Sequence, residues 1–205
     1  MTEPTSDTTP VRPAKSRRRR ALIAAAVAAA LAVVVLGVVS ALSVAAKHTG
    51  AATVSSALIG RPAPPLGGET VTGGHASLGA YRGRWVIINF FASWCVPCQQ
   101  ETPELVRFAA AHTRPTDPAI LGVVYQDDDG SVRSFIHDHG VTWPLLAYRT
   151  ISAANSYGVT GIPVTFLVSP DGTVAAKALG GLRTGQLDTL LAAAEAKLAA
   201  PTTTR

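Results

Sequence analysis

A run of 26 residues without a charged side chain, Ala21–Ala46, constrains this 205-residue chain more than any other feature. As a helix the run would be about 39 Å long at ~1.5 Å per residue, enough to cross ~30 Å of hydrocarbon. Four arginines, Arg17–Arg20, precede it, and positive charge on this side favours a cytoplasmic N-terminus. The sequence therefore predicts a disordered basic tail over residues 1–20 and a transmembrane anchor over residues 21–46.

A cleaved signal peptide is the main alternative to a retained anchor. Val44-Ala45-Ala46 is an acceptable small-residue cleavage site, although the apolar segment is longer than the ~7–15 residues that a signal peptide needs. Both interpretations export the remainder of the chain, in which residues 47–59 are predicted to be a linker. The predicted location is the bacterial cell membrane, with a single pass, a cytoplasmic N-terminus and an extracytoplasmic domain.

The positive charge of the chain is concentrated in the tail. The formal net charge is +5, but residues 1–20 hold six basic and two acidic groups, whereas residues 21–205 hold 12 basic and 11 acidic groups. The nearly neutral domain lacks the excess of basic groups that a nucleic-acid-binding face needs, so no nucleic-acid partner is predicted. Two cysteines also exclude a disulfide-dense scaffold and a four-thiolate zinc site.

Residues 60–201 alternate between strand and helix patterns. The central strand is the continuous apolar run Trp85–Phe91, which is typical of a strand covered on both faces. A hairpin that turns at Gly73-Gly74 precedes it, and Thr184 is a plausible N-cap for the last helix. Further strands are predicted over 119–125, 144–147, 164–168 and 173–179, and helices over 95–112, 132–139 and 152–157. This order predicts an α/β domain with a mixed central sheet flanked by helices.

The two cysteines lie in Trp94-Cys95-Val96-Pro97-Cys98, between the central strand and a helix. The helix N-terminus favours a thiolate at Cys95, and Cys98, one turn later, can attack a mixed disulfide. Pro97 stiffens the loop between the sulfurs. A zinc half-site would need two further ligands, and a c-type haem attachment needs a histidine where Gln99 stands. The motif therefore favours redox exchange between dithiol and disulfide.

The sequence from Val86 to Cys98, followed by Pro103, Gly158–Phe166 and Pro170-Asp171-Gly172, resembles the thioredoxin fold. Within that superfamily it is most similar to membrane-anchored TlpA/ResA-type thiol-disulfide oxidoreductases. The resemblance covers residues 60–198 and includes an inserted segment near residues 127–157.

The resemblance implies site residues beyond the cysteines. Pro163 is expected to be cis and to pack against the cysteine pair, which leaves the backbone of Ile162 free to bind an extended substrate. Trp94 is similar to the active-site tryptophan of the family, although a packing role is an alternative. Pro103 resembles a helix-kinking proline, with a helix end at Thr102 as the alternative.

At two positions this sequence has a different residue from known members of the superfamily. Asn89 stands where thioredoxin has a buried aspartate, and Val164 stands where some cytochrome-maturation relatives have a glutamate. Glu101, three residues after Cys98, matches the active-site glutamate of ResA-like proteins, so it is the remaining candidate acid. A surface-exposed glutamate is the alternative.

The predicted function is extracytoplasmic thiol-disulfide exchange, acting as a reductant of exported cysteine-containing proteins, with apocytochrome c as a candidate substrate. The expected electron donor is a membrane protein, and no cofactor is implied. A disulfide-forming oxidase and a copper or haem chaperone are the alternatives. A peroxiredoxin is disfavoured, because it needs Thr or Ser three residues before the reactive cysteine, where this chain has Ala92.

Overall fold

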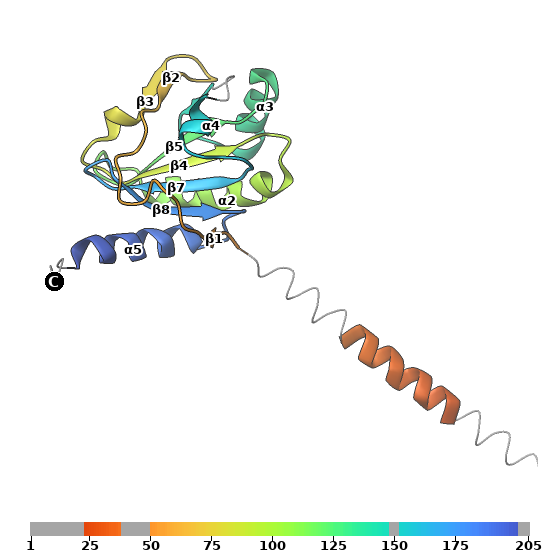
Figure 1. The fold of residues 1–205 in the computed structure, drawn as a ribbon. Helices are drawn as coiled ribbons and strands as arrows, with labels where there is room; N and C mark the ends of the chain where they lie inside the picture. The colour runs from red at the N-terminus through yellow and green to blue at the C-terminus, as the bar shows by residue number, and fades with distance from the viewer. Residues whose placement is uncertain (1–22, 38–49, 148–151, 201–205) are drawn as a thin grey trace, which may run out of the picture. The chain divides into compact units, whose positions relative to one another are not determined.

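The computed structural model describes residues 23–37, 50–147 and 152–200, and the chain divides into two compact units, residues 1–49 and 50–205. Residues 23–37 of the first unit form a helix (Figure 1). Among the described helices, none combines the length and hydropathy that crossing a membrane requires. The predicted tail over 1–20, the rest of the predicted anchor (21–22 and 38–46) and the start of the predicted linker (47–49) lie outside the described residues.

A mixed six-stranded sheet forms the centre of the second unit, in the order β1-β8-β7-β4-β5-β6. Strand β4 (Val86–Phe91) lies in the interior, parallel to β5 and antiparallel to β7. All six of its residues are buried, as the apolar run predicted. The other strands are β1 (Ala52–Thr53), β5 (Ala119–Val124), β6 (Leu145–Leu146), β7 (Val164–Val168) and β8 (Val174–Leu179). This arrangement confirms the predicted mixed sheet.

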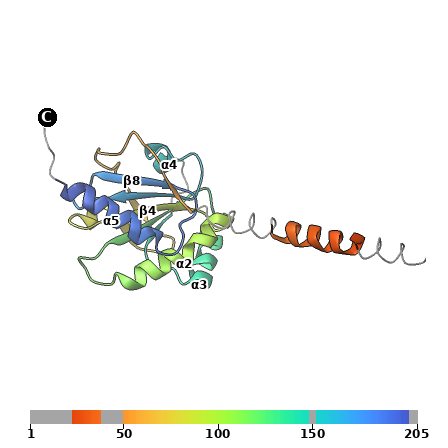
Figure 2. The same ribbon diagram turned by 90° about the horizontal axis from the view of Figure 1, so that it is seen from below.

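Helices cover both faces of this sheet. Alternate residues of β4 point to opposite faces, so each face buries its own apolar cluster beneath the helices that cover it. On one face, α2 (Val96–Ala111) and α5 (Gln186–Ala199) bury Phe108 and Leu187 in a cluster with Ile87 of β4. Next to them, Phe135 of α3 (Asp129–His139) packs on Phe91, with ring centroids 5.5 Å apart. The short helix α4 (Ser152–Ser156) covers the other face. Figure 2 shows α2 beside α3, with α4 on the opposite side of the sheet.

The predicted hairpin forms a separate two-stranded sheet of β2 (Gly67–Glu69) and β3 (His75–Ser77). Its turn includes Gly73 and Gly74, whose φ angles are 90° and 84°. These are left-handed values that glycine adopts without steric cost. A 3-10 helix, η1 (Leu78–Tyr81), connects the hairpin to β4.

Part of the predicted linker over residues 47–59 forms a strand in the structure. Strand β1 pairs with the end of β8 in antiparallel register, with Ala52 opposite Leu179. The backbone N–H of Ala51 donates to Oε1 of Gln186 at 3.1 Å, and Ala51 itself is buried. A two-residue strand is too short to give a recognisable sequence pattern, so these residues resembled a spacer.

The start of α5 also differs from the prediction. Its N-cap is Gly185 rather than Thr184, and Gly185 has a φ of 76° and no side chain to cap with. The Glu104 carboxylate of α2 accepts the N–H groups of Gly185 and Leu187 at 3.0 and 3.1 Å. A side chain from another helix thus satisfies the first turn of α5.

Candidate active site

Cys95 and Cys98 form a disulfide at the start of α2, with their Cα atoms 5.2 Å apart. Strand β4 ends at Phe91, and a short turn places Cys95 at the N-cap of the helix. The N–H of Cys98 donates to Sγ of Cys95 at 3.3 Å. Pro97 lies in the first helical turn, where its missing N–H costs no helical hydrogen bond. The strand, the turn and the helix together fix the geometry of the pair.

The helix N-terminus favours negative charge on Cys95 once the disulfide is reduced. The first turn of α2 carries no acidic residue, and the positive end of a 16-residue helix stabilises an anion at this position. The Cys98 N–H, already directed at Cys95 Sγ, is a donor for the thiolate. Cys95 is 5% exposed and Cys98 is 1% exposed. The more exposed cysteine of the pair is thus the one that the helix activates.

The loop before β7 lies against the same site. The Ile162–Pro163 peptide bond is cis, as the resemblance implied, and Pro163 is buried. The carbonyl of Pro163 accepts the N–H of Gly180 at 3.0 Å. Ile162, which is half-buried, packs against the apolar cluster that includes both cysteines. Two distant parts of the chain therefore meet at the disulfide.

Two apolar side chains beside the disulfide are exposed. Trp94 is 58% exposed and Val96 is 59% exposed. The indole N–H of Trp94 donates to the carbonyl of Gln126 at 3.2 Å, which orients the ring without burying it. Because exposed apolar side chains that flank a reactive group mark an interaction site, this arrangement fits contact with another protein better than a packing role for Trp94.

Glu101 lies in the interior beneath the first turns of α2. Its side chain is 1% exposed, so the alternative of a surface glutamate is wrong. Nδ2 of Asn89 donates to Oε1 at 2.8 Å, and the N–H of Leu182 donates to Oε2 at 3.0 Å. Burial raises the pKa of Glu101 to about 7, against the opposing effect of these two hydrogen bonds. The carboxyl group can therefore gain or lose a proton near neutral pH.

Helix α2 continues through Pro103, so a helix end at Thr102 is also wrong. Proline leaves the carbonyl four residues earlier without its helical donor. At the preceding residue, Oγ1 of Thr102 donates to the carbonyl of Cys98 at 2.8 Å. The first part of the helix is thus supported by side chains as well as by its own backbone.

The contact between Asn89 and Glu101 was not predicted. Asn89 stands where thioredoxin has a buried aspartate, and in the structure its amide is a hydrogen-bond donor to the buried acid Glu101. A signal was present, since Asn89 is the single polar residue in the run Trp85–Phe91. A buried polar group in such a strand needs a partner.

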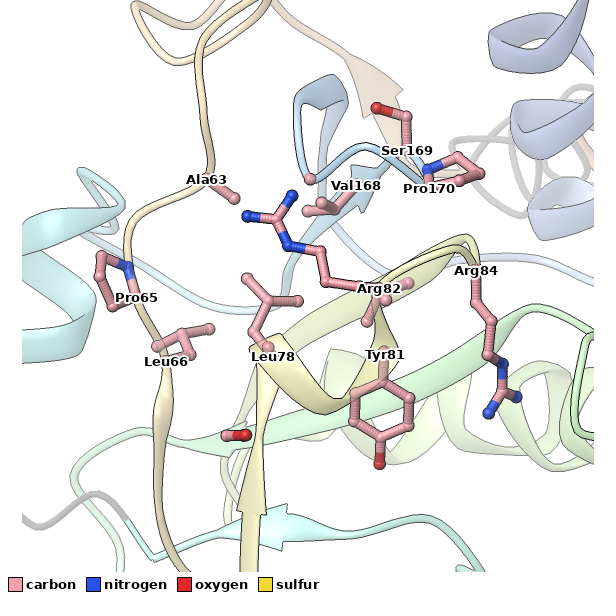
Figure 3. Close-up of a pocket in the computed structure, with 14 residues that line it drawn as sticks. Ala63, Pro65, Leu66, Leu78, Tyr81, Arg82, Arg84, Val168, Ser169 and Pro170 are labelled. Carbon is pink, nitrogen blue, oxygen red and sulfur yellow. The ribbon is translucent and has the colours of Figure 1, made fainter.

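A cavity of about 330 Å³ lies at the other end of the sheet (Figure 3). Val86 and Val168, which are register partners at the ends of β4 and β7 farthest from Cys95 and Pro163, both line it. Arg82 points into this cavity and donates to the carbonyl of Asp171. None of the predicted site residues lines it. It is therefore separate from the cysteine site.

A family model described as AhpC/TSA family matches residues 59–177, which is more than half of the chain. The chain belongs to the AhpC/TSA family. The chain is 31% identical over 116 residues to the thiol-disulfide oxidoreductase ResA of Geobacillus thermodenitrificans (strain NG80-2), a match that covers 57% of this chain and 66% of that protein. It is 29% identical over 115 residues to ResA of Bacillus subtilis (strain 168), covering 56% and 64%.

The solved structures that it resembles have the same architecture. A thiol:disulfide interchange protein of the thioredoxin family from Chlorobium tepidum TLS matches with a TM-score of 0.59 and 25% identity, covering 69% of this chain and 99% of that one. The domain therefore has a thioredoxin-like fold, as the sequence motifs predicted. The chain spans less than two thirds of the two ResA proteins.

Proposed function

We propose that the AhpC/TSA-family domain is a thiol-disulfide oxidoreductase that exchanges its Cys95–Cys98 disulfide with cysteines of other proteins. The observation that carries the proposal is a disulfide at a helix N-terminus, with the helix N–H of Cys98 directed at Cys95 Sγ. The cis-proline loop lies beside it. A relative that is 31% identical over 116 residues is named thiol-disulfide oxidoreductase ResA.

In the reducing direction the cycle has two steps. The Cys95 thiolate attacks one sulfur of a substrate disulfide, which forms a mixed disulfide and releases the first substrate thiolate. Cys98 then loses its proton and attacks Cys95 Sγ, so that the second substrate thiolate leaves and the Cys95–Cys98 disulfide closes. Two electrons pass from the domain to the substrate. The buried Glu101 carboxylate, one helical turn from Cys98, is the group proposed to accept the Cys98 proton.

The proposed substrates are exported proteins that contain cysteines, with apocytochrome c thiols as the candidate that the TlpA/ResA resemblance implies. The exposed Trp94 and Val96 offer an apolar surface on which such a chain could lie. Electrons would return from a membrane protein. No cofactor is needed, because the disulfide itself carries both electrons.

The proposed location is outside the cytoplasm, tethered to the membrane. The support is the uncharged run over residues 21–46 directly after Arg17–Arg20. Within that run residues 23–37 are helical. Retention as an anchor is proposed over cleavage after Ala46, because the apolar run is longer than a signal peptide needs.

The test is catalysed reduction of insulin by the full-length protein, with the equilibrium potential of the Cys95–Cys98 couple measured against glutathione. Catalysis that is lost in Cys95→Ser supports exchange. A potential below about −250 mV supports a reductant, and a potential near −120 mV would mean a disulfide-forming oxidase. Stoichiometric copper or haem binding by the reduced protein, without insulin reduction, would instead mean a chaperone.

A further inference from the structure

The Asn89 side chain occupies an unusual place for a polar group. It lies at the centre of β4, 2% exposed, in a strand whose residues are all buried. Its Nδ2 donates to Glu101 Oε1 at 2.8 Å and to Thr165 Oγ1 at 3.2 Å. Thr165 is the register partner of Asn89 on β7. The sheet therefore fixes both the position and the orientation of the amide.

A second donor reaches the Glu101 carboxylate from the segment after β8. The N–H of Leu182 donates to Oε2 at 3.0 Å, so each carboxylate oxygen has its own donor. The groups that donate to Glu101 are thus the Asn89 amide from β4 and the Leu182 N–H from this segment. Cys98 precedes Glu101 by three residues on the same helix, and residues at this spacing lie on one helical face. The pKa of Glu101 is shifted by burial, Leu182 and Asn89, with no charged side chain among the causes.

We propose that Asn89 is a positioning residue of the exchange reaction, whose amide, oriented by Thr165, holds the Glu101 carboxylate ready to take the Cys98 proton. This proposal rests on the proposed function. In the step concerned, Cys98 S–H transfers its proton to Glu101 and attacks Cys95 Sγ of the mixed disulfide. The Cys95–Cys98 bond forms, the bond from Cys95 to the substrate breaks, and the substrate leaves as a thiolate that is protonated afterwards.

An amide suits this task because it donates and does not titrate. A hydrogen bond to the ionised carboxylate lowers its pKa and so opposes the effect of burial. Without the Asn89 donor the pKa of Glu101 rises further, and less carboxylate is available at a given pH. An aspartate at position 89 would instead place a second acid within hydrogen-bond distance of Glu101, and two such groups cannot both ionise readily.

The test is the pH dependence of disulfide exchange by the full-length protein. We expect the wild-type exchange rate to rise with pH, with a midpoint set by the pKa of Glu101. In Glu101→Gln this rising limb of the pH–rate profile should be absent. Asn89→Ala is expected to move the midpoint to higher pH by about one unit or more, which is the loss of one hydrogen bond to a charged group. A purely structural role would lower the rate without moving the midpoint, and an unmoved midpoint overturns the proposal.

Two further variants keep the proposal testable if Asn89→Ala does not fold. Thr165→Val keeps the volume of the side chain and removes the acceptor that orients Asn89, so it is expected to move the midpoint in the same direction by a smaller amount. The exchanged pair Asn89→Asp with Glu101→Gln restores an acid and an amide in contact, and is expected to regain a pH-dependent limb that Glu101→Gln alone lacks. An unmoved midpoint in Thr165→Val, together with no rising limb in the double variant, would overturn the proposal.

Failure of the proposed function can be told apart from failure of this inference. If the wild-type protein exchanges no disulfide at any pH, the proposed function is wrong, and the inference fails with it as a statement about exchange. If exchange occurs, an NMR titration of the Glu101 carboxyl group reports on Asn89 directly. We expect its pKa to be higher in Asn89→Ala than in the wild type, and an equal pKa would refute the positioning role alone.

Discussion

The backbone of Gly181 lies against the carbonyl of Pro97, so closely that a Cβ atom at position 181 would be 3.0 Å from the Pro97 oxygen. Pro97 stands between the two cysteines, whereas Gly181 belongs to the segment after β8. The next residue, Leu182, supplies one of the two donors to Glu101. The segment after β8 therefore packs against the disulfide turn through Gly181 and donates a hydrogen bond to the buried Glu101 through Leu182.

Replacement of Gly181 by alanine is expected to destabilise the protein by about 1–3 kcal/mol, the usual cost of overpacking a closely packed contact. The backbone oxygen of Pro97 cannot move without displacing the disulfide turn, so exchange should also slow. Chemical denaturation and insulin reduction measure the two effects. Gly79→Ala is the matched control, because only Ser77 Oγ, at 4.0 Å, lies near a Cβ atom there. Equal stability of the two variants would contradict the account.

Glu104→Gln is expected to lower the free energy of unfolding by about 2 kcal/mol at pH 7, which is the scale of hydrogen bonds to a charged group. Burial acts to raise the pKa of Glu104, but Arg107 and the N–H groups of Gly185 and Leu187 outweigh it and lower the pKa. A lowered pKa stabilises the fold above the pKa of the unfolded chain, and this stability is lost as the pH falls. The deficit of the variant should therefore shrink in acid.

The control for Glu104 is its neighbour in the same network. Asp188 also pairs with Arg107, but its side chain is 46% exposed. Exposed ion pairs contribute ~0–1 kcal/mol, so Asp188→Asn should change the free energy of unfolding much less. Urea unfolding at pH 7 and at pH 3 compares the two variants. A larger loss in Asp188→Asn than in Glu104→Gln would show that α5 is not held by the buried carboxylate.

Glu101 has the opposite pH dependence. Its pKa is raised from 4.5 to about 7 by burial, so the folded protein binds a proton that the unfolded chain has released between these values. The wild-type protein should accordingly lose stability as the pH rises through this window. Glu101→Gln removes that slope and is expected to slow exchange ten-fold or more. A stability profile with the same slope in both proteins would mean that Glu101 titrates normally.

Local patterns were sufficient where neighbouring residues decide the structure. The run Trp85–Phe91 predicted the buried strand β4, and the strands predicted over 164–168 and 173–179 correspond to β7 and β8. The predicted end of the helix over 132–139 is confirmed, because α3 ends at His139 and Gly140 is its left-handed C-cap with a φ of 67°. In each case hydrophobic periodicity or the conformational preference of one residue type carries the information.

Contacts between distant residues could not be predicted in the same way. Glu101 and Leu182 are 81 positions apart, and Ala51 and Gln186 are 135 positions apart. The cap of α5 by Glu104 and the pairing of β1 likewise depend on which segments the fold brings together. The resemblance to relatives supplied the cis-proline and the position of Glu101, but not the donors that hold Glu101 in place.

The membrane proposal predicts a specific topology. A reporter that is active only outside the cytoplasm, fused after Gly60, should be active, and the full-length protein should remain with the membranes after a carbonate wash. The reason is that an uncharged run of 26 residues after four arginines favours insertion with the N-terminus inside. A soluble product with a new N-terminus near Lys47 would show cleavage instead, and an inactive reporter would refute export.

The central claim is that Cys95 attacks the substrate and Cys98 resolves the mixed disulfide, and trapping tests it most directly. The Cys98→Ser variant lacks the resolving thiol, so mixed disulfides through Cys95 should accumulate on non-reducing gels when the full-length protein meets its substrates. Cys95→Ser should trap almost none, because the remaining Cys98 is 1% exposed as a residue and lies inside the first turn of α2 rather than at its N-cap. Equal trapping by the two variants, or stronger trapping by Cys95→Ser, would contradict the account.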